Sequence, residues 1–154
     1  MRPLLRVCAL ALLGAATVAS AVEVQVKNAW VRSATQGQAA TPAYVDIRSD
    51  TPLRLVGATS PWARSVEIRT LELQAGLPSE KAVAALDVAA GAEFRLAPGG
   101  SYLALVDVQR AFGNGDFVPI TLRFEDAKRT VHTVDLEAQA RGLLLAKPPA
   151  AKTE

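Results

Sequence analysis

Short runs in which apolar and polar side chains alternate dominate the sequence from residue 22 onward. The first run, residues 22–27, places a valine at every second position, and similar runs occupy residues 43–47, 53–56, 66–73, 93–96, 102–108, 119–124 and 130–136. Each run has about the length of one β-strand, and a period of two is the pattern of a strand buried on one face. The sequence therefore predicts an all-β fold.

Turn-forming residues separate these runs. Clusters of Gly, Pro, Asp, Asn and Ser stand at residues 49–52, 75–78, 98–100, 113–116 and 125–128. Many short strands at this spacing predict a single domain built as a β-sandwich or barrel with Greek-key connections. Residues 82–90 are rich in alanine, which favours helix, but Pro78 and Gly91 bound them. We interpret this segment as a strand with a short turn.

The first 21 residues have the composition of a secretory signal. Arg2 and Arg6 precede an apolar run at residues 7–18, and Ala19-Ser20-Ala21 supplies a small-x-small cleavage site. We predict a signal peptide at residues 1–21, a periplasmic location and no membrane span in the mature chain, since the apolar run is shorter than a bilayer requires. A lipid anchor on Cys8 is the disfavoured alternative, because Cys8 precedes the apolar core.

Removal of the signal changes the charge and the sulfur content. The whole chain has 17 basic and 15 acidic residues, and loss of Arg2 and Arg6 leaves equal numbers. Binding of nucleic acid requires clustered basic residues, so we expect no nucleic-acid partner. Cys8 and Met1 are the only sulfur-containing residues of the chain. The mature chain is therefore expected to contain no sulfur.

The C-terminal segment differs in composition from the rest. We place the domain at residues 22–137 and a tail at 138–154, in which the Leu143–Leu145 triplet docks either on the domain or on a partner. The residues after it combine proline, alanine and lysine without aromatic residues. Such a composition buries too little surface to offset the entropy of ordering, so we expect the last residues to be disordered.

Residues that could support catalysis are few. The single histidine, His132, lies within a predicted strand, and no cysteine or Gly-x-Ser-x-Gly motif offers a nucleophile beside it. We therefore predict that the protein is not an enzyme. We interpret Trp30 and Trp62 as packing residues. Four carboxylates near turns are interpreted as solvated residues rather than a calcium site: Asp107, Asp116, Glu125 and Asp126.

Several segments, in this order and spacing, resemble the periplasmic copper chaperones of the PCu(A)C family. They are AWVR at 29–32, AYVDI at 43–47, LRLVGATSP at 53–61, VEI at 66–68, AGAEFRL at 90–96, PGG at 98–100 and GDFVPITLRF at 115–124. Together they span nearly all of the mature domain. The resemblance implies a cupredoxin-like β-sandwich, in agreement with the alternation.

The resemblance also implies where copper would bind. In the family a His and a Met follow the VEI-type strand, another Met follows, and a His-x-Met pair comes after the PGG turn. The corresponding positions here are Arg69, Leu71, Glu80 (uncertain by a residue or two), Tyr102 and Ala104. Cu(I) selects thiolate, thioether and imidazole donors, and none of these five side chains offers one. We therefore expect no metal site and no cofactor, although the family implies copper.

Three functions remain open. The first is an accessory or assembly protein of copper-enzyme maturation, in which the five positions form a partner surface for a copper-enzyme subunit or another copper chaperone. The second is a working copper chaperone with a noncanonical site, where His132 and oxygen donors would bind Cu(II). The third is reuse of the scaffold for an unrelated protein partner. We favour the first, because the scaffold motifs are present while the copper ligands are absent.

Overall fold

The computed structural model describes residues 22–142, and the predicted signal peptide and residues 143–154 lie outside this range. The described part is all-β, as predicted, and contains no helix that could cross a membrane. Its ten strands are β1 (Val24–Arg32), β2 (Ala40–Ser49), β3 (Leu53–Thr59), β4 (Ala63–Gln74), β5 (Leu77–Ala82), β6 (Leu86–Val88), β7 (Glu93–Leu96), β8 (Ser101–Val108), β9 (Phe117–Glu125) and β10 (Val131–Arg141).

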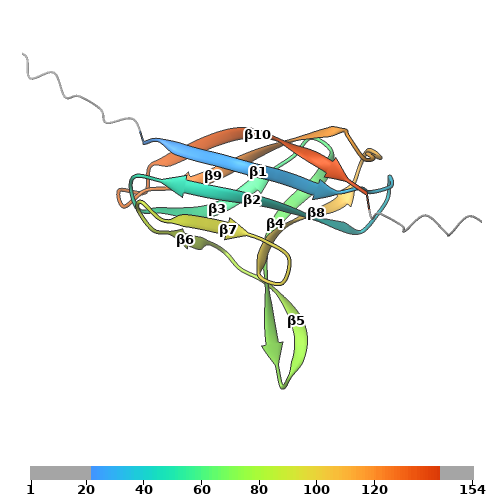
Figure 1. Cartoon of the computed structure of the whole chain (residues 1–154), viewed down its shortest axis with the longest axis horizontal. Helices are drawn as coiled ribbons and strands as arrows, with labels where there is room; N and C mark the ends of the chain where they lie inside the picture. Colours follow the sequence, from blue (N-terminus) through green and yellow to red (C-terminus); the bar gives the residue numbers. More distant parts are fainter. Residues whose placement is uncertain (1–21, 143–154) are drawn as a thin grey trace, which may run out of the picture.

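The strands form one sheet that closes on itself as a flattened sandwich (Figure 1). The order is β5-β4-β8-β2-β1-β10-β9-β3-β6, and a pairing of β3 with β4 at Ala58 and Val66 closes the ring. β7 extends the edge of β2 beside β8. Only β1 and β10 pair in parallel among the named strands of residues 22–142.

The alternation seen in the sequence produces the core. Along β2, Thr41, Ala43, Val45 and Ile47 are buried, while the residues between them face outward. The largest fully buried side chains include Phe124, Ile47, Leu55, Leu96, Leu103, Leu105 and Leu122. Full burial of each such side chain contributes about 1.5–3 kcal/mol of transfer free energy. The core therefore lies between the two layers and leaves the outward positions free for function.

β5 was not expected from the sequence. The turn predicted at residues 75–78 involves only Ala75 and Gly76, whose φ angles are 52° and 81°. Two central residues with positive φ make the tight hairpin that connects β4 to β5. β5 is largely exposed on both faces, so it carries no alternation. The hairpin of β4 and β5 projects from the body as an arm (Figure 1). The alanine-rich segment is not helical and contains the short strand β6.

β10 continues to Arg141, four residues beyond the predicted end of the domain at Glu137. Ala138 and Ala140 are buried, and the parallel pairing with β1 involves residues 139–141. The alternation continues here with alanine as its apolar member, a residue too small to stand out in the pattern. β10 therefore extends past the predicted boundary at 137.

Candidate functional site

A pocket of about 390 Å3 lies on the outer face of the sheet, where β1, β2, β8, β4 and β5 meet. Mostly outward positions of these strands, together with the turn between β7 and β8, line it. The lining residues are Arg32, Ala40, Thr41, Pro42, Tyr44, Arg69, Leu71, Glu80, Gly99, Gly100, Tyr102 and Ala104. This volume accommodates a few side chains of a partner or a small ligand.

Strand register explains why these residues meet. Arg69 of β4 lies directly opposite Tyr102 of β8, and Leu71 lies opposite Glu80 of β5. Side chains of directly opposite residues share one face of a sheet, as do residues two apart along a strand. The turn at Gly99, whose φ of 86° suits glycine, leads into β8. A few local pairings thus assemble the pocket.

The structure brings all five residues singled out from the sequence into this pocket. Arg69, Leu71, Glu80, Tyr102 and Ala104 each line it. These residues come from three strands and are separated by up to 35 positions in the chain.

The sequence did not single out Arg32, Tyr44 and Glu67 as site residues. The only sign of them in the sequence was that each lies at an outward-facing position of a segment that resembles the PCu(A)C family.

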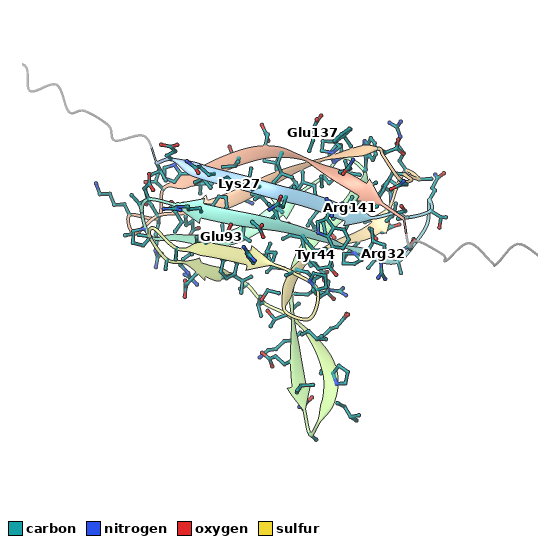
Figure 2. All side chains as sticks on the ribbon, in the orientation of Figure 1. Lys27, Arg32, Tyr44, Glu93, Glu137 and Arg141 are labelled. Carbon is teal, nitrogen blue, oxygen red and sulfur yellow. The ribbon has the colours of Figure 1, made fainter. Side chains whose placement is uncertain are left out.

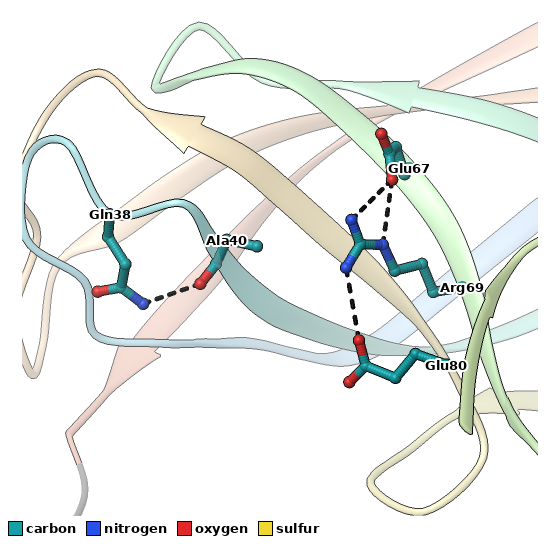
Figure 3. Close-up of polar contacts among 5 residues, drawn as sticks. All are labelled: Gln38, Ala40, Glu67, Arg69 and Glu80. Atoms are coloured by element: carbon teal, nitrogen blue, oxygen red, sulfur yellow. Dashed lines mark hydrogen bonds and ion pairs between the residues drawn. The ribbon is translucent and has the colours of Figure 1, made fainter. Parts of the chain in front are cut away.

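Arg69 is held by two carboxylates (Figure 3). Its Nε and Nη2 atoms donate to Oε2 of Glu67 at 3.0 and 2.9 Å, and Nη1 lies 3.5 Å from Oε2 of Glu80. The hydrogen bond to Glu67 is the main cause that raises the pKa of Arg69 above its ordinary value. The guanidinium is therefore fixed in direction and permanently charged. Figure 3 also shows the Gln38 amide, which donates to the carbonyl of Ala40 at 2.9 Å.

Aromatic rings form a row beside Arg69. The ring centroids of Trp30 and Tyr44 are 4.5 Å apart, and those of Tyr44 and Tyr102 are 6.3 Å apart. Burial raises the pKa of both tyrosines, and the hydrogen bond with Glu80 raises that of Tyr102 further. Both phenols consequently stay neutral. Trp30 was expected to be a packing residue, and it packs at one end of this row.

The donor set of the pocket does not fit Cu(I). A guanidinium has no lone pair to donate, and the remaining groups are carboxylate, phenol, hydroxyl and backbone oxygens. Soft Cu(I) prefers sulfur and imidazole. Over residues 22–142 no cluster of three or more His, Cys, Asp or Glu side chains is arranged to hold a metal ion.

His132 lies outside the pocket and contacts a carboxylate. Its Nε2 atom is 3.0 Å from Oδ2 of Asp126, and Oδ1 of Asp126 accepts hydrogen bonds from the N–H groups of Lys128 and Thr130 at 2.8 and 2.9 Å. The hydrogen bond with His132 is the main cause that lowers the pKa of Asp126 to about 2. This arrangement fastens the turn between β9 and β10.

Two of the other carboxylates near turns, and the second tryptophan, also have structural contacts. Asp116 accepts a hydrogen bond from the N–H of Gly113 at 2.8 Å, and Asp107 pairs with Arg64 at 2.7 Å. The ring of Trp62 lies 5.8 Å from that of Phe112, between centroids. Packing was the role predicted for this tryptophan.

Comparison with known proteins gives the family. The sequence profile described as "Putative lipoprotein LpqE-like" matches residues 24–136, most of the chain. The chain belongs to the LpqE-like family. A relative from Leifsonia xyli subsp. xyli, named "Putative lipoprotein Lxx21020", is 35% identical over 107 residues, or 67% of this chain and 63% of that protein. The chain thus spans less than two thirds of that relative's length.

Solved structures similar to this LpqE-like chain include PCuAC domains, and they support the predicted cupredoxin-like sandwich. The copper-bound PCuAC domain from PmoF2 is 27% identical, with a TM-score of 0.58 over 78% of this chain and 96% of that domain. Apo-DR1885 from Deinococcus radiodurans is 27% identical, with a TM-score of 0.57 over 94% of this chain and 96% of that one. The resemblance stated from the sequence is therefore supported for the fold and the broad family.

Proposed function

We propose that this protein serves in the maturation of a copper enzyme as a binding or assembly partner, and that its pocket contacts protein where related domains hold copper. One observation carries the proposal. The five positions matched to copper ligands gather around one pocket, yet they supply Arg69, Glu80 and Tyr102 in place of sulfur and imidazole. Such a pocket retains the shape of a binding site and lacks the donors for Cu(I).

The side chains present suit protein recognition. Tyr and Arg are enriched among the residues that contribute most to interface affinity. Tyr102 offers an aromatic face and a neutral hydroxyl, while Arg69 offers a guanidinium whose side chain is 26% exposed. The proposed partner is a copper-enzyme subunit or another copper chaperone that presents an acidic side chain to this pocket. No catalytic step forms part of the proposal.

The proposed location is the cell envelope. The name of the Leifsonia relative, a lipoprotein, suggests an exported protein, and residues 1–21 have the composition of a signal. We propose cleavage before Val22. Mass spectrometry of the protein recovered from the envelope tests this. An N-terminus at Val22 would support cleavage there, whereas a lipid attached to Cys8 would contradict it and indicate an anchored protein.

A copper titration tests the absence of a Cu(I) site. The purified mature chain is titrated with Cu(I) against a competing chelator, with an unrelated β-sandwich lacking Cys and Met as reference. Affinity no greater than that of the reference is expected. Stoichiometric, tight Cu(I) binding would overturn the proposal. Parallel titration of His132→Ala with Cu(II) checks the alternative site, which requires loss of binding in that variant.

Partner capture tests the surface. Tagged wild type, Arg69→Ala and Tyr102→Ala are compared with the control Arg95→Ala. Arg95 does not line the pocket, and its guanidinium lies 2.7 Å from the carboxylate of Glu93. A copper protein recovered by wild type and Arg95→Ala, and lost with both pocket variants, supports the proposal. A partner without copper would point to reuse of the scaffold. Equal recovery by all four proteins would contradict the pocket as the contact surface.

A further inference from the structure

Cross-strand pairs of charged residues in residues 22–142 combine opposite charges, with one exception. The pairs of opposite charge are Lys27 with Asp46, Arg95 with Asp46, Arg48 with Glu93, and Arg54 with both Asp87 and Glu125. The exception is Arg32 of β1, which lies opposite Arg141 of β10. Like charges at neighbouring positions on one face of a sheet repel each other. This arginine pair therefore reduces the stability of the fold.

No carboxylate of the described residues neutralises the arginine pair. The arginines that form salt bridges within residues 22–142 are Arg54, Arg64, Arg69 and Arg95. Arg32 and Arg141 take part in none of these salt bridges, and both are exposed. The guanidinium of Arg141 lies 5.3 Å from the centre of the Trp30 ring, on the outer face of the sheet. Figure 2 shows Arg32, Arg141 and Tyr44 close together where β1 and β10 end. Two such guanidiniums side by side suit a bound anion.

Arg69, the other guanidinium of the pocket, is already occupied. Its Nε and Nη2 atoms donate to Glu67, and its Nη1 atom lies 3.5 Å from Glu80. A carboxylate that approaches Arg69 has to compete with these two acidic side chains. Arg32 also lines the pocket and offers a guanidinium without such a competitor. An acidic ligand is therefore expected at the arginine pair rather than at Arg69.

The residues next to the arginine pair form an apolar floor. The register of β1 and β2 places Pro42 beside Arg32, and Pro42 lies opposite Ala104 of β8. Ala104 in turn lies opposite Glu67 of β4. Pro42 and Ala104 both line the pocket. The pocket thus begins at a cationic end on β1 and β10, continues over an apolar floor, and ends at the carboxylates of β4 and β5.

An acidic segment of a protein fits this distribution of charge. A flat anionic membrane would bring its negative charge to the whole face, including the carboxylates Glu67 and Glu80 at the other end of the pocket. Sites for the carboxylate of a chain end use free backbone N–H groups. Here β1 lies between β2 and β10, and β10 lies between β1 and β9, so ladder bonds on both sides use the backbone groups of these strands. The anion-binding groups are two side chains, and the occupant that they favour is an acidic side chain.

The spacing of the floor fits an extended segment that crosses the strands. Side chains at positions i and i+2 of an extended chain share one face and lie about 6.8 Å apart. Pro42 and Ala104 lie one and two strand spacings from Arg32, at about 4.8 Å for each spacing. With a carboxylate at the arginine pair, the side chain two residues away therefore lies over the floor between Pro42 and Ala104.

We propose that the arginine pair binds an acidic side chain of the partner, and that an apolar side chain two residues away in the same extended segment fills the pocket over Pro42 and Ala104. The bound carboxylate relieves the repulsion between Arg32 and Arg141. This inference rests on the proposed function, because it takes the pocket as a surface for protein. It adds the kind of sequence that the pocket recognises, an acidic residue, any residue and an apolar residue.

Titration of the mature chain with capped peptides, followed by nuclear magnetic resonance, tests the proposal. The probe is acetyl-Gly-Glu-Gly-Leu-Gly-amide, its uncharged control replaces Glu with Gln, and the signals followed are the Trp30 indole and the Tyr44 amide. We expect the Glu peptide to displace both signals with a Kd in the millimolar range. The Gln peptide should bind at least about fivefold more weakly, the size of effect that exposed ion pairs allow.

Variants of the protein assign the carboxylate to the arginine pair. Arg32→Gln and Arg141→Gln should each weaken binding of the Glu peptide by about fivefold, and added salt should weaken it in wild type. The matched control is Arg48→Gln, because Arg48 is an exposed arginine of β2 that lies opposite Glu93 and does not line the pocket. This control should bind the peptide as wild type does.

Thermal unfolding at low salt measures the repulsion without any ligand. Arg32→Gln should raise the Tm by about 1–3 °C, because it removes one of two neighbouring like charges. High salt should abolish the difference, since exposed charges are then screened. Arg48→Gln should not raise the Tm, because it removes a charge that lies opposite Glu93. A Tm of Arg32→Gln at or below that of wild type at low salt would contradict the unrelieved repulsion.

Three results of the titration would overturn the proposal. Equal binding of the Glu and Gln peptides, or no displacement at tens of millimolar, would exclude recognition of a carboxylate. Unchanged affinity in both Arg32→Gln and Arg141→Gln would place the carboxylate elsewhere. Binding to phosphatidylglycerol vesicles that is lost in Arg32→Gln, with no binding of the Glu peptide, would assign the pair to lipid. These readouts need neither copper nor a captured partner. If they fail while capture of a copper protein still depends on Arg69 and Tyr102, the proposed function stands and this inference alone is wrong.

Discussion

Arg69 places a permanent positive charge in the pocket. It lies directly opposite Tyr102, and directly opposite side chains in antiparallel strands have Cβ atoms about 4.5–5.5 Å apart. Two imidazoles at these positions could therefore reach one metal ion. Leu71 and Ala104 follow two residues later on the same face. The backbone thus holds these four positions around one pocket, while their side chains supply no soft donor.

Introducing soft donors at these positions should create a copper site. The variant Arg69→His/Leu71→Met/Tyr102→His/Ala104→Met is expected to bind one Cu(I) in competition with a chelator, because two imidazoles and two thioethers then face one pocket. Ala104 is 1% exposed, so its enlargement should cost about 1–3 kcal/mol of stability. A control with alanine at 69 and 102 and the same methionines should bind far more weakly. A folded fourfold variant that binds no Cu(I) would show that the pocket is not the counterpart of the family site.

Asp126 should make stability depend on acid pH. Its pKa is lowered from 3.8 to about 2, chiefly by the hydrogen bond with His132. A carboxyl with a depressed pKa stabilises the fold fully above its unfolded value and loses that contribution as pH falls through the folded value. The wild-type Tm should therefore fall more steeply between pH 4 and pH 2 than that of Asp126→Asn, as measured by thermal unfolding.

Asp87→Asn is the matched control for this experiment, because its side chain is 88% exposed and pairs only with Arg54 at 3.2 Å among the described residues. It should follow the wild-type slope. Equal slopes for wild type and Asp126→Asn would refute a stabilising role for the contact between Asp126 and His132. The sequence could not reveal this contact, since six residues separate Asp126 from His132 and only the turn geometry brings them together.

The candidate site was partly accessible from the sequence. The resemblance to the PCu(A)C motifs pointed to Arg69, Leu71, Glu80, Tyr102 and Ala104, and all five line the one pocket. It did not reveal that Glu67 holds Arg69. Residues two apart on a strand share a face, but whether their side chains meet depends on rotamers that a sequence does not specify.

The arm of β4 and β5 is the least expected element. Leu73 and Leu77 near its tip are 77% and 71% exposed, so the arm gains little from burial and depends on its ladder and turn. The N–H of Leu71 points towards β8 and donates to the carbonyl of Gly100 at 3.1 Å. Successive N–H groups along a strand point to opposite sides, so those of the residues on either side of Leu71 point to β5. Pro78 then faces the free edge with no N–H to offer, which discourages pairing with another chain.

Substitution at the turn should alter the stability of the arm. Ala75 has a φ of 52°, and a residue with a Cβ in this region costs roughly 1–2 kcal/mol unless its side chain compensates. Asparagine tolerates this conformation and favours the tight hairpin turn before glycine. Ala75→Asn should slow amide hydrogen exchange in residues 71–80 relative to wild type.

Gly76→Ala is the opposing control for the arm. Gly76 has a φ of 81°, and open space surrounds it, so any effect of a Cβ there comes from backbone strain. This variant should speed exchange over residues 71–80. Faster exchange in Ala75→Asn than in wild type would contradict the assigned turn. The sequence missed β5 for a related reason, since a strand exposed on both faces has no hydrophobic period to detect.

Closure of the sandwich depends on the two ends of the described chain. The sequence predicted most strands because each buries one face, but it could not predict that the first and last strands pair in parallel. Such a pairing joins Trp30 to Gln139 and Arg32 to Arg141 across more than 100 residues. No local pattern encodes a partner at that distance, and none marked residues 138–141 as part of β10.

The position of the domain end can be tested by two truncations. A chain ended after Glu137 loses Ala140, whose N–H donates to the carbonyl of Asp116 at 2.7 Å and whose carbonyl accepts from Gly115 at 3.0 Å. It also loses the bond from Ser33 to the Arg141 carbonyl and the buried methyl groups of Ala138 and Ala140. At about 1 kcal/mol for each hydrogen bond, the loss should reach about 3 kcal/mol before the exposed edge of β1 is counted. Urea unfolding should therefore show a marked drop in midpoint for this chain, whereas a chain ended after Gly142 should keep its midpoint close to that of the full chain. Equal midpoints for the two truncations would mean that residues 138–141 add nothing to the fold.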